Sequence, residues 1–265
     1  MKKLLTLIGL ISLTIVFSCQ TSDVKSEDKI ILGIFGGMGP EATADLYKQI
    51  VNLTPATKDQ EHIPTFIYSL PQVPDRIASI DNQDPAIIPV ITAAVQRLEK
   101  SGASFIAIPC NTVHYYYNDM QNAVSIPIIH MIKETVIEVN KKYPKVKRIG
   151  LLATSGTIKT QLYNNELKAN GFEVIVPNDN IEEEKVMKAV WGIKSGVEQQ
   201  INEDLLAIAG QHLIDNGAEL LILGCTEIPL AFNPNRSSVP VVNATKVLAE
   251  RAISMYQKMN LKKSK

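Results

Sequence analysis

Short apolar runs alternate with longer amphipathic segments along this chain, and this alternation restricts its fold more than any other feature. In the first half, the runs at 29–37, 65–70 and 104–110 predict strands, and the segments at 41–52 and 85–102 predict helices. Strands that are separated by helices of this length pair in parallel, with helices on both faces of the sheet. The pattern therefore predicts an α/β fold.

The second half repeats the same order. Strands are predicted at 147–154, 172–177, 218–225 and 239–245, with a helix at 155–171, further helical stretches up to Gly217 and a helix at the end of the chain. The repeat also has nearly constant spacing, because Gly33 precedes Cys110 by 77 positions and Gly150 precedes Cys225 by 75. We therefore expect two similar α/β halves.

This repeat predicts two pseudo-symmetric, open parallel-sheet domains with flanking helices and the active site in the cleft between them. We expect the first domain to comprise residues 30–123 together with about 238–262, and the second to comprise residues 124–237. Residues 20–29 are polar and are predicted to be a tether.

Composition and charge exclude some classes of partner. The chain has 265 residues, of which 45% are hydrophobic and 20% charged, as in ordinary globular proteins. The chain has 27 lysine and arginine residues and 27 aspartate and glutamate residues. This balance gives no indication of a basic surface or of a nucleic-acid partner. An acidic ligand would have to be held by a few well-placed cations.

The N-terminus predicts export. A short basic "MKK" precedes the apolar run "LLTLIGLISLTIVFS", which is too short for a comfortable membrane span and ends just before Cys19. This pattern resembles a bacterial lipoprotein signal at 1–19, in which Cys19 is lipidated and anchors the protein to a membrane, facing the periplasm or the cell surface. The alternative is an ordinary cleaved signal with an incidental cysteine.

The two remaining cysteines, Cys110 and Cys225, each end a predicted strand and precede small polar residues. Ligands bind at this edge of open parallel sheets, so two facing halves would place one thiol on each wall of a cleft. We expect the following helix start to lower each thiol pKa. In an exported protein the two could instead form a disulfide, but we expect the substrate space to keep them apart and reduced.

Two thiols on opposite walls suit stereochemical inversion at a carbon atom. One thiolate would remove a proton from one side of the carbon, and the opposite thiol would deliver a proton to the other side. Hydrogen-bond donors must then hold the carboxylate of the carbanion. Candidates at strand ends are Asn111, Thr112, Thr154, Ser155 and Thr226, together with bare backbone N–H groups of the turn "GGMGP".

The ordered motifs "GIFGGMGPEAT", "TPATKDQEH", "PQVPDR", "PCNTVH", "LLATSGT" and "GCTE" resemble the cofactor-independent aspartate racemases of the aspartate/glutamate racemase superfamily. The resemblance runs from about residue 30 to the C-terminus. It implies that Cys110 and Cys225 are the two acid/base residues. It also implies a homodimer that needs no pyridoxal phosphate.

The resemblance further implies an acidic amino acid as the small-molecule substrate. Its binding residues would be Met38, Asn111, Thr112, Thr154 and Thr226, with Arg76 and Lys194 holding the second carboxylate. No ligand cluster accompanies His114, so no metal is expected.

Two positions separate this chain from its relatives. Glutamate racemases tend to carry Asp-Ser where this chain has Gly36 and Gly37, which weakens a glutamate-only interpretation. Asn243 stands where the family more usually has aspartate, and we expect a small effect on local hydrogen bonding.

Other functions remain open on the sequence alone. One alternative is a related enzyme with broader or different specificity, acting on glutamate, hydantoins or maleate, or a decarboxylase of the same scaffold. Another is a non-catalytic periplasmic lipoprotein that binds acidic amino acids. The paired thiols argue against both the single-cysteine decarboxylases and a pure binding protein.

Overall fold

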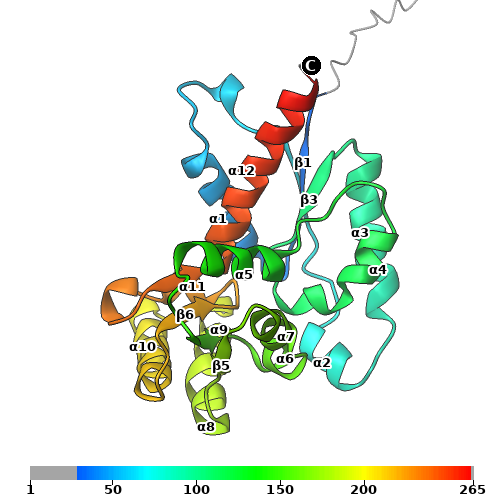
Figure 1. Ribbon diagram of the computed structural model, residues 1–265. Helices are drawn as coiled ribbons and strands as arrows, with labels where there is room; N and C mark the ends of the chain where they lie inside the picture. Colours follow the sequence, from blue (N-terminus) through cyan, green and yellow to red (C-terminus); the bar gives the residue numbers. More distant parts are fainter. Residues whose placement is uncertain (1–28, 264–265) are drawn as a thin grey trace, which may run out of the picture.

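The computed structural model describes residues 29–263, so the predicted signal and Cys19 lie outside the described residues. Two parallel sheets form the framework, each belonging to one lobe of the molecule (Figure 1). The first is a 3-stranded sheet in the order β2-β1-β3, and the second a 4-stranded sheet in the order β5-β4-β6-β7. The predicted α/β fold with two parallel-sheet halves is confirmed.

The strands correspond between the halves. In the first sheet they are β1 (Leu32–Gly36), β2 (Thr65–Ser69) and β3 (Phe105–Ala107); in the second, β4 (Arg148–Leu152), β5 (Glu173–Ile175), β6 (Leu220–Leu223) and β7 (Val241–Asn243). Gly33 of β1 pairs with Phe66 and Ile106, and Gly150 of β4 pairs with Ile175 and Leu221. β3 and β6, which precede the two cysteines, are therefore equivalent strands.

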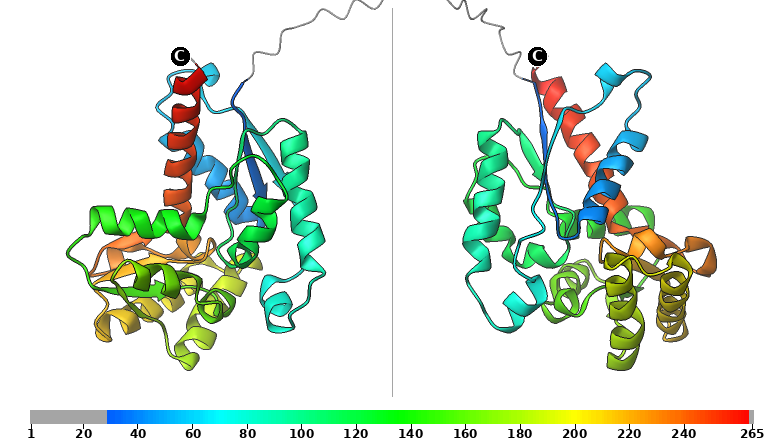
Figure 2. Two further views of the ribbon diagram at one scale, coloured as in Figure 1. Left: turned by 45° about the vertical axis from the view of Figure 1, so that its right-hand side comes forward. Right: turned by 180° about the vertical axis from the view of Figure 1, so that it is seen from behind.

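Helices cover both faces of each sheet (Figures 1 and 2). They are α1 (Pro40–Leu53), α2 (Arg76–Asp81), α3 (Ile87–Lys100), α4 (Tyr117–Asn122), α5 (Met131–Lys142), α6 (Ser155–Lys159), α7 (Leu162–Ala169), α8 (Asp179–Ile181), α9 (Lys188–Lys194), α10 (Gln199–Asp215), α11 (Ile228–Ala231) and α12 (Ala244–Lys263). Short 3-10 turns lie at η1 (Asp59–Glu61), η2 (Thr112–Tyr116) and η4 (Pro234–Arg236), and a π-helical turn, η3 (Glu182–Met187), precedes α9. Among residues 29–263, no helix is both long and apolar enough to span a bilayer.

The alternating faces of the strands account for this layering. In β1, Leu32 and Ile34 pack toward α1 and α12, whereas Phe35 packs on the opposite side with α3. In β6, Leu221 packs toward α10 and Ile222 packs with α5 and α7. Successive strand residues point to opposite faces, so each sheet has a separate apolar core on each side.

One predicted helix is interrupted. The segment at 155–171, expected as a single helix, forms α6 and α7 with Gln161 between them in the left-handed region, at φ 55°. Thr160 Oγ1 donates back to the carbonyls of Gly156 and Thr157 at 2.9 and 3.0 Å. A hydroxyl that bonds to the preceding turn competes with the continuing helix, which explains the break.

The C-terminal segment is shared between the two sheets. β7 pairs with β6 in the second sheet, although the sequence placed residues 238–262 with the first domain. α12 packs instead against α1, and Leu248 lies in the same core as Leu32 (Figure 1). The chain thus crosses from the second sheet to the first at Ala244.

Gly36 is required for the turn that follows β1. An added Cβ would overlap the Thr43 side chain, whose Oγ1 accepts from Gly37 N at 2.8 Å and donates to Gly39 O at 2.7 Å. Gly36→Ala should therefore lower the free energy of unfolding by about 2 kcal/mol, measured by urea denaturation. The double variant Gly36→Ala/Thr43→Ala should cost less than the sum of the two single changes. Additive costs would contradict this steric account.

Candidate active site

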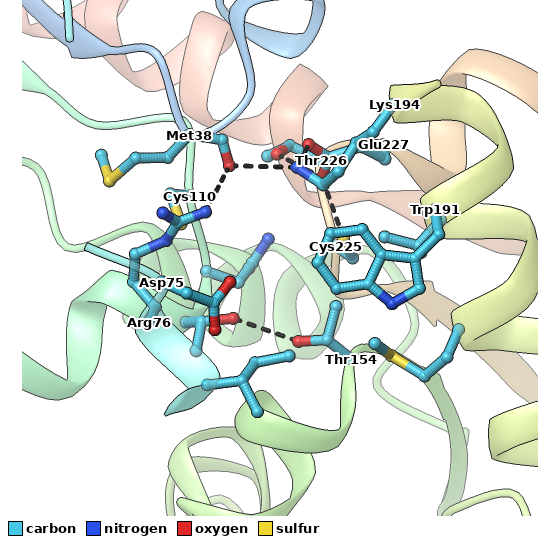
Figure 3. A pocket seen from close by; sticks show the side chains of 15 residues that line it. Met38, Asp75, Arg76, Cys110, Thr154, Trp191, Lys194, Cys225, Thr226 and Glu227 are labelled. Carbon is cyan, nitrogen blue, oxygen red and sulfur yellow. Dashed lines mark hydrogen bonds and ion pairs between the residues drawn. The ribbon is translucent and has the colours of Figure 1, made fainter. Parts of the chain in front are cut away.

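A cavity that is partly open to solvent lies between the two sheets, with about 420 Å³ of empty space in and at the mouth of it, and both cysteines line it (Figure 3). Its lining includes most of the residues that the sequence placed in the site: Met38, Arg76, Cys110, Asn111, Thr112, Thr154, Lys194, Cys225 and Thr226. Ser155, also expected as a donor, does not line this cavity, and its hydroxyl lies 3.9 Å from Met187 Sδ. Asp75, Ile77, Met187, Val190, Trp191 and Glu227 complete it. Loops after β1, β3, β4 and β6 contribute to the lining, which is the arrangement expected at the carboxyl edge of parallel sheets.

Both thiols are free and buried. Cys110 is 5% and Cys225 6% exposed, and neither forms a disulfide. Cys110 follows β3 and Cys225 follows β6, so the two sulfurs come from equivalent places in the two sheets. The two halves thus contribute one thiol each to the same cavity.

The prediction that helix starts lower both thiol pKa values was wrong. Burial raises the pKa of Cys110, and it raises the pKa of Cys225 well above its ordinary value. The segments that follow the cysteines are only the 3-10 turn η2 and the four-residue helix α11, which supply little helix dipole. The Arg76 charge offsets part of the effect at Cys110, whereas the Glu227 carboxylate adds to it at Cys225.

Glu227 is a site residue whose role the sequence did not reveal. It directly precedes α11, but its side chain caps no backbone N–H of that helix. Instead, Glu227 Oε2 accepts from Cys225 Sγ at 3.1 Å and from Thr226 Oγ1 at 3.4 Å, and Oε1 forms an ion pair with Lys194 Nζ. The carboxylate is 4% exposed. It therefore connects one thiol to one cation.

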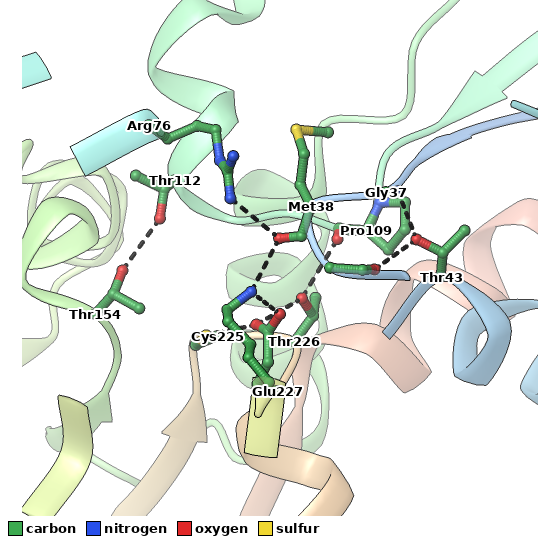
Figure 4. A network of polar contacts seen from close by, with 12 residues as sticks. Gly37, Met38, Thr43, Arg76, Pro109, Thr112, Thr154, Cys225, Thr226 and Glu227 are labelled. Atoms are coloured by element: carbon green, nitrogen blue, oxygen red, sulfur yellow. Dashed lines mark hydrogen bonds and ion pairs between the residues drawn. The ribbon is translucent and has the colours of Figure 1, made fainter. Parts of the chain in front are cut away.

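Two cations from distant parts of the chain converge on one backbone carbonyl (Figures 3 and 4). Arg76 Nη2 and Lys194 Nζ each donate to Met38 O at 3.5 Å. Arg76 Nη1 also donates to the carbonyls of Val73 and Pro74, at 3.2 and 3.1 Å. In the described part of the chain, the guanidinium forms no ion pair, so its charge is not neutralised by a bonded carboxylate.

Three threonine hydroxyls form a cluster that joins the two halves, and Figure 4 shows the contact between two of them, Thr112 and Thr154. Thr112 Oγ1 lies 3.1 Å from Thr154 Oγ1 and 2.9 Å from Thr157 Oγ1, and the last two lie 3.1 Å apart. Thr112 follows β3, whereas Thr154 and Thr157 follow β4. Each hydroxyl can rotate to donate, so the cluster can turn its protons toward an anion. Thr157 was not predicted.

The Asn111 side chain is fixed with its amide donor free. Tyr163 O–H donates to Asn111 Oδ1 at 2.8 Å, and Asn111 Nδ2 has no hydrogen-bond partner among the described residues although Asn111 is only 2% exposed. A buried N–H₂ group without a partner is costly, so a ligand acceptor in the cavity would be favoured there.

His114 holds the backbone at Cys110 and is not placed as a metal ligand. Burial lowers the His114 pKa, so the ring is neutral at pH 7. Met131 N–H donates to Nε2 at 3.1 Å, so Nδ1 carries the proton and donates to Cys110 O at 2.7 Å.

The glycine turn supplies fewer donors than expected. Gly37 N–H, predicted to be bare, already donates to Thr43 Oγ1, and Met38 presents its carbonyl to the two cations. The backbone of this turn nevertheless packs closely against the site, because an added Cβ at Gly39 would lie 3.0 Å from Glu227 Oε1 and 3.3 Å from Lys194 Nζ.

The sequence model of the Asp/Glu/hydantoin racemase family matches residues 35–252. A curated relative, the broad specificity amino-acid racemase RacX of Bacillus subtilis (strain 168), is 32% identical over 232 residues, which cover 85% of this chain and 98% of the relative. The solved structure of Picrophilus torridus aspartate racemase has a TM-score of 0.77 and 26% identity, covering 86% of this chain and 94% of that one.

A third comparison shows the fold alone. The glutamate racemase of Francisella tularensis subsp. tularensis SCHU S4, solved in complex with D-glutamate, has a TM-score of 0.62 at 21% identity. The alignment covers 88% of this chain and 83% of that one. The two-sheet architecture is therefore shared with both kinds of structural neighbour.

The raised thiol pKa values predict slow alkylation in the ligand-free protein. A group whose pKa lies above its ordinary value stays protonated at pH 7, so the iodoacetamide rate at Cys110 and Cys225 should keep rising with pH to beyond pH 9. Peptide mapping by mass spectrometry measures each rate separately. A plateau below pH 7 at either cysteine would contradict this account.

Proposed function

The chain belongs to the Asp/Glu/hydantoin racemase family, and on that premise we propose that it is an aspartate racemase that inverts Cα with Cys110 and Cys225 and without a cofactor. The observation that carries the choice of substrate is the convergence of Arg76 and Lys194 on Met38 O, in the cavity that both thiols line. Contacts of 3.5 Å to a neutral carbonyl are weak, so a carboxylate can replace them.

The remaining polar groups suit the α-carboxylate end of the substrate. Asn111 Nδ2 and the hydroxyls of Thr112 and Thr154 are donors that can turn toward an anion, and Thr226 lies on the side of Cys225. Negative charge moves onto the α-carboxylate when the α-proton leaves. These donors would therefore bind the carbanion more strongly than the substrate, which is what lowers the barrier.

The proposed inversion uses the two thiols in opposite protonation states. The thiolate on one wall takes the α-proton, the electron pair remains on Cα and spreads into the carboxylate, and the thiol on the other wall delivers its proton to the opposite face. Burial disfavours the thiolate at both cysteines. The ammonium group of a bound amino acid would bring a positive charge to the cavity and favour the thiolate.

A broader specificity has one observation in its favour. Glu227 already pairs with Lys194, so less positive charge remains uncompensated for a substrate side chain. A second hollow, with about 830 Å³ of empty space, adjoins the cavity and shares Arg76, Trp191 and Lys194 with it. It would accept a longer side chain, such as that of glutamate.

Proton NMR in D₂O with the D- and L-forms of aspartate, glutamate and alanine tests the proposal. Loss of the α-proton signal and formation of the opposite enantiomer should be fastest with aspartate. Cys110→Ala and Cys225→Ala should each lower racemisation at least about 100-fold. No exchange on any of these amino acids, with the thiols shown to be reduced, would favour a binding protein or a different substrate.

Two lysines on α9 provide a matched pair of variants, which distinguishes recognition of the substrate side chain from a general effect of charge. Lys194→Met should raise KM for aspartate at least about tenfold, because it removes a cation from the cavity. Lys188→Met, on the same helix but exposed, should leave KM within about twofold. An unchanged KM in Lys194→Met would favour the broader specificity.

Export, lipid anchoring and a homodimer also belong to the proposal, on the strength of the N-terminal sequence and the family resemblance. Incorporation of an alkyne-labelled fatty acid into the full-length chain, and its loss in Cys19→Ser, tests the anchor. Sedimentation of residues 20–265 gives the oligomeric state.

A further inference from the structure

The two thiols have unequal partners, although they come from equivalent strands. Cys225 Sγ donates to Glu227 Oε2 at 3.1 Å. Within residues 29–263, Cys110 Sγ donates to no carboxylate, and the adjacent His114 binds the Cys110 carbonyl instead of its sulfur. The pseudo-symmetry of the fold therefore does not extend to the immediate surroundings of the sulfurs.

The geometry around Glu227 determines which partner is protonated. Lys194 Nζ forms an ion pair with Oε1, which keeps the carboxylate charged, and a charged carboxylate can only accept hydrogen bonds. Cys225 must then be the donor, which means that it is the thiol. The Thr226 hydroxyl has a single proton, which it shares between Glu227 Oε2 at 3.4 Å and Pro109 O at 3.3 Å.

We propose that Glu227 is a positioning residue that holds Cys225 as the proton donor of the resting molecule and leaves Cys110 as the base that acts first. This inference rests on the proposed racemase function and assigns an order to its two thiols. Nothing in the sequence distinguishes the two cysteines in this way, because the "GCTE" motif alone does not show where the glutamate points.

The proton movements balance over one turnover. Cys110 S⁻ takes the proton from Cα, so an S–H bond forms as the C–H bond breaks and the electron pair remains on Cα. Cys225 S–H then delivers its proton to the opposite face of Cα, and its sulfur becomes S⁻. The product form has Cys110 S–H and Cys225 S⁻ beside the Glu227 carboxylate, and repulsion between these two anions favours return of a proton to Cys225. The starting state is restored when Cys225 takes a proton from water while Cys110 releases its proton to water, or when Cys225 takes the α-proton of a substrate of the opposite hand and Cys110 delivers its own proton to the other face.

Other charged groups around the sulfurs are consistent with this order. Arg76 on α2 favours the thiolate of Cys110, and Lys194 on α9 favours the thiolate at both cysteines. The Glu227 charge also disfavours the thiolate of Cys110, where its effect is smaller than those of burial and of Arg76. Asp75 lines the cavity, but its Oδ1 accepts from Ala78 N at 2.8 Å at the start of α2. Burial raises the pKa of Tyr163, which faces Cys225, so this phenol remains neutral. Glu227 is thus the carboxylate bonded directly to a thiol.

Alkylation by iodoacetamide tests the inference without any substrate. In Glu227→Gln, which keeps the shape of the side chain but removes its charge, Cys225 should react at least about tenfold faster at pH 8, with the midpoint of its pH profile about one unit lower. Cys110 in the same molecule is the internal control and should change by less than about threefold. The limiting rate at high pH should be unchanged, which separates acidity from access.

Lys194→Met should change the reactivity of Cys225 in the opposite direction. Removing the cation leaves the Glu227 charge unopposed, so Cys225 should react at least about threefold more slowly at pH 8 than in the wild type. A variant that merely loosened the cavity would make both cysteines react faster. Opposite shifts in the two variants, larger at Cys225 than at Cys110, therefore support the proposal, and Lys194→Met keeps it testable if Glu227→Gln does not fold.

Two results would overturn the proposal. One is an unchanged Cys225 midpoint in Glu227→Gln, and the other is an equal shift at Cys110. Failure of the racemase function would be seen separately, as a wild-type protein that exchanges no α-proton while Cys225 still responds to Glu227→Gln.

Discussion

Burial of two thiols between two sheet edges is the constraint on which the rest of the site depends. A buried sulfur resists ionisation, and both cysteines are almost fully enclosed. The site can use a thiolate only if nearby charges compensate for the lost solvation. The charges of Arg76 and Lys194 and the hydrogen-bond donors around Asn111 therefore determine whether a cysteine can ionise. Glu227 makes ionisation harder at Cys225 than at Cys110, so the two walls of the cavity differ.

The two halves depend on each other through contacts at this cavity. Thr112 contacts Thr154, and Thr226 Oγ1 can donate to Pro109 O at 3.3 Å across the lobes (Figure 4). Thr112 also contacts Thr157. On the surface, Lys159 Nζ bonds Asp81 at 3.0 Å, between α6 and α2. An exposed pair of this kind contributes little stability. Closure of the cavity is thus maintained mainly by the buried hydroxyls and by the packing of α2 on α6.

Much of the architecture could be predicted because its signals are local or repeated. Apolar runs bounded by glycine marked β1 and β6, and the near-equal spacing from Gly33 to Cys110 and from Gly150 to Cys225 indicated the duplication. The resemblance placed Arg76 and Lys194 in one cavity, where the structure has them. Their distance along the chain gave no independent indication that they would meet.

The features that sequence reasoning missed depend on tertiary contacts. Thr157 and Tyr163 act through partners from the other half, at Thr112 and Asn111, and no motif joins these positions. The thiol pKa direction was wrong because burial, which no short pattern reports, outweighs the effect of two short helices. Glu227 was visible in "GCTE", but its bond to Cys225 follows from side-chain direction.

The central claim is that two thiols act on opposite faces of one carbon, and the early fate of solvent hydrogen tests it most directly. L-Aspartate would be incubated in D₂O, and both enantiomers would be recovered before about a tenth has reacted. Opposed thiols predict deuterium at Cα of the D-product and almost none in the recovered L-substrate. Protium retained in the product, or equal deuterium in both enantiomers from the start, would indicate a single base and contradict the account.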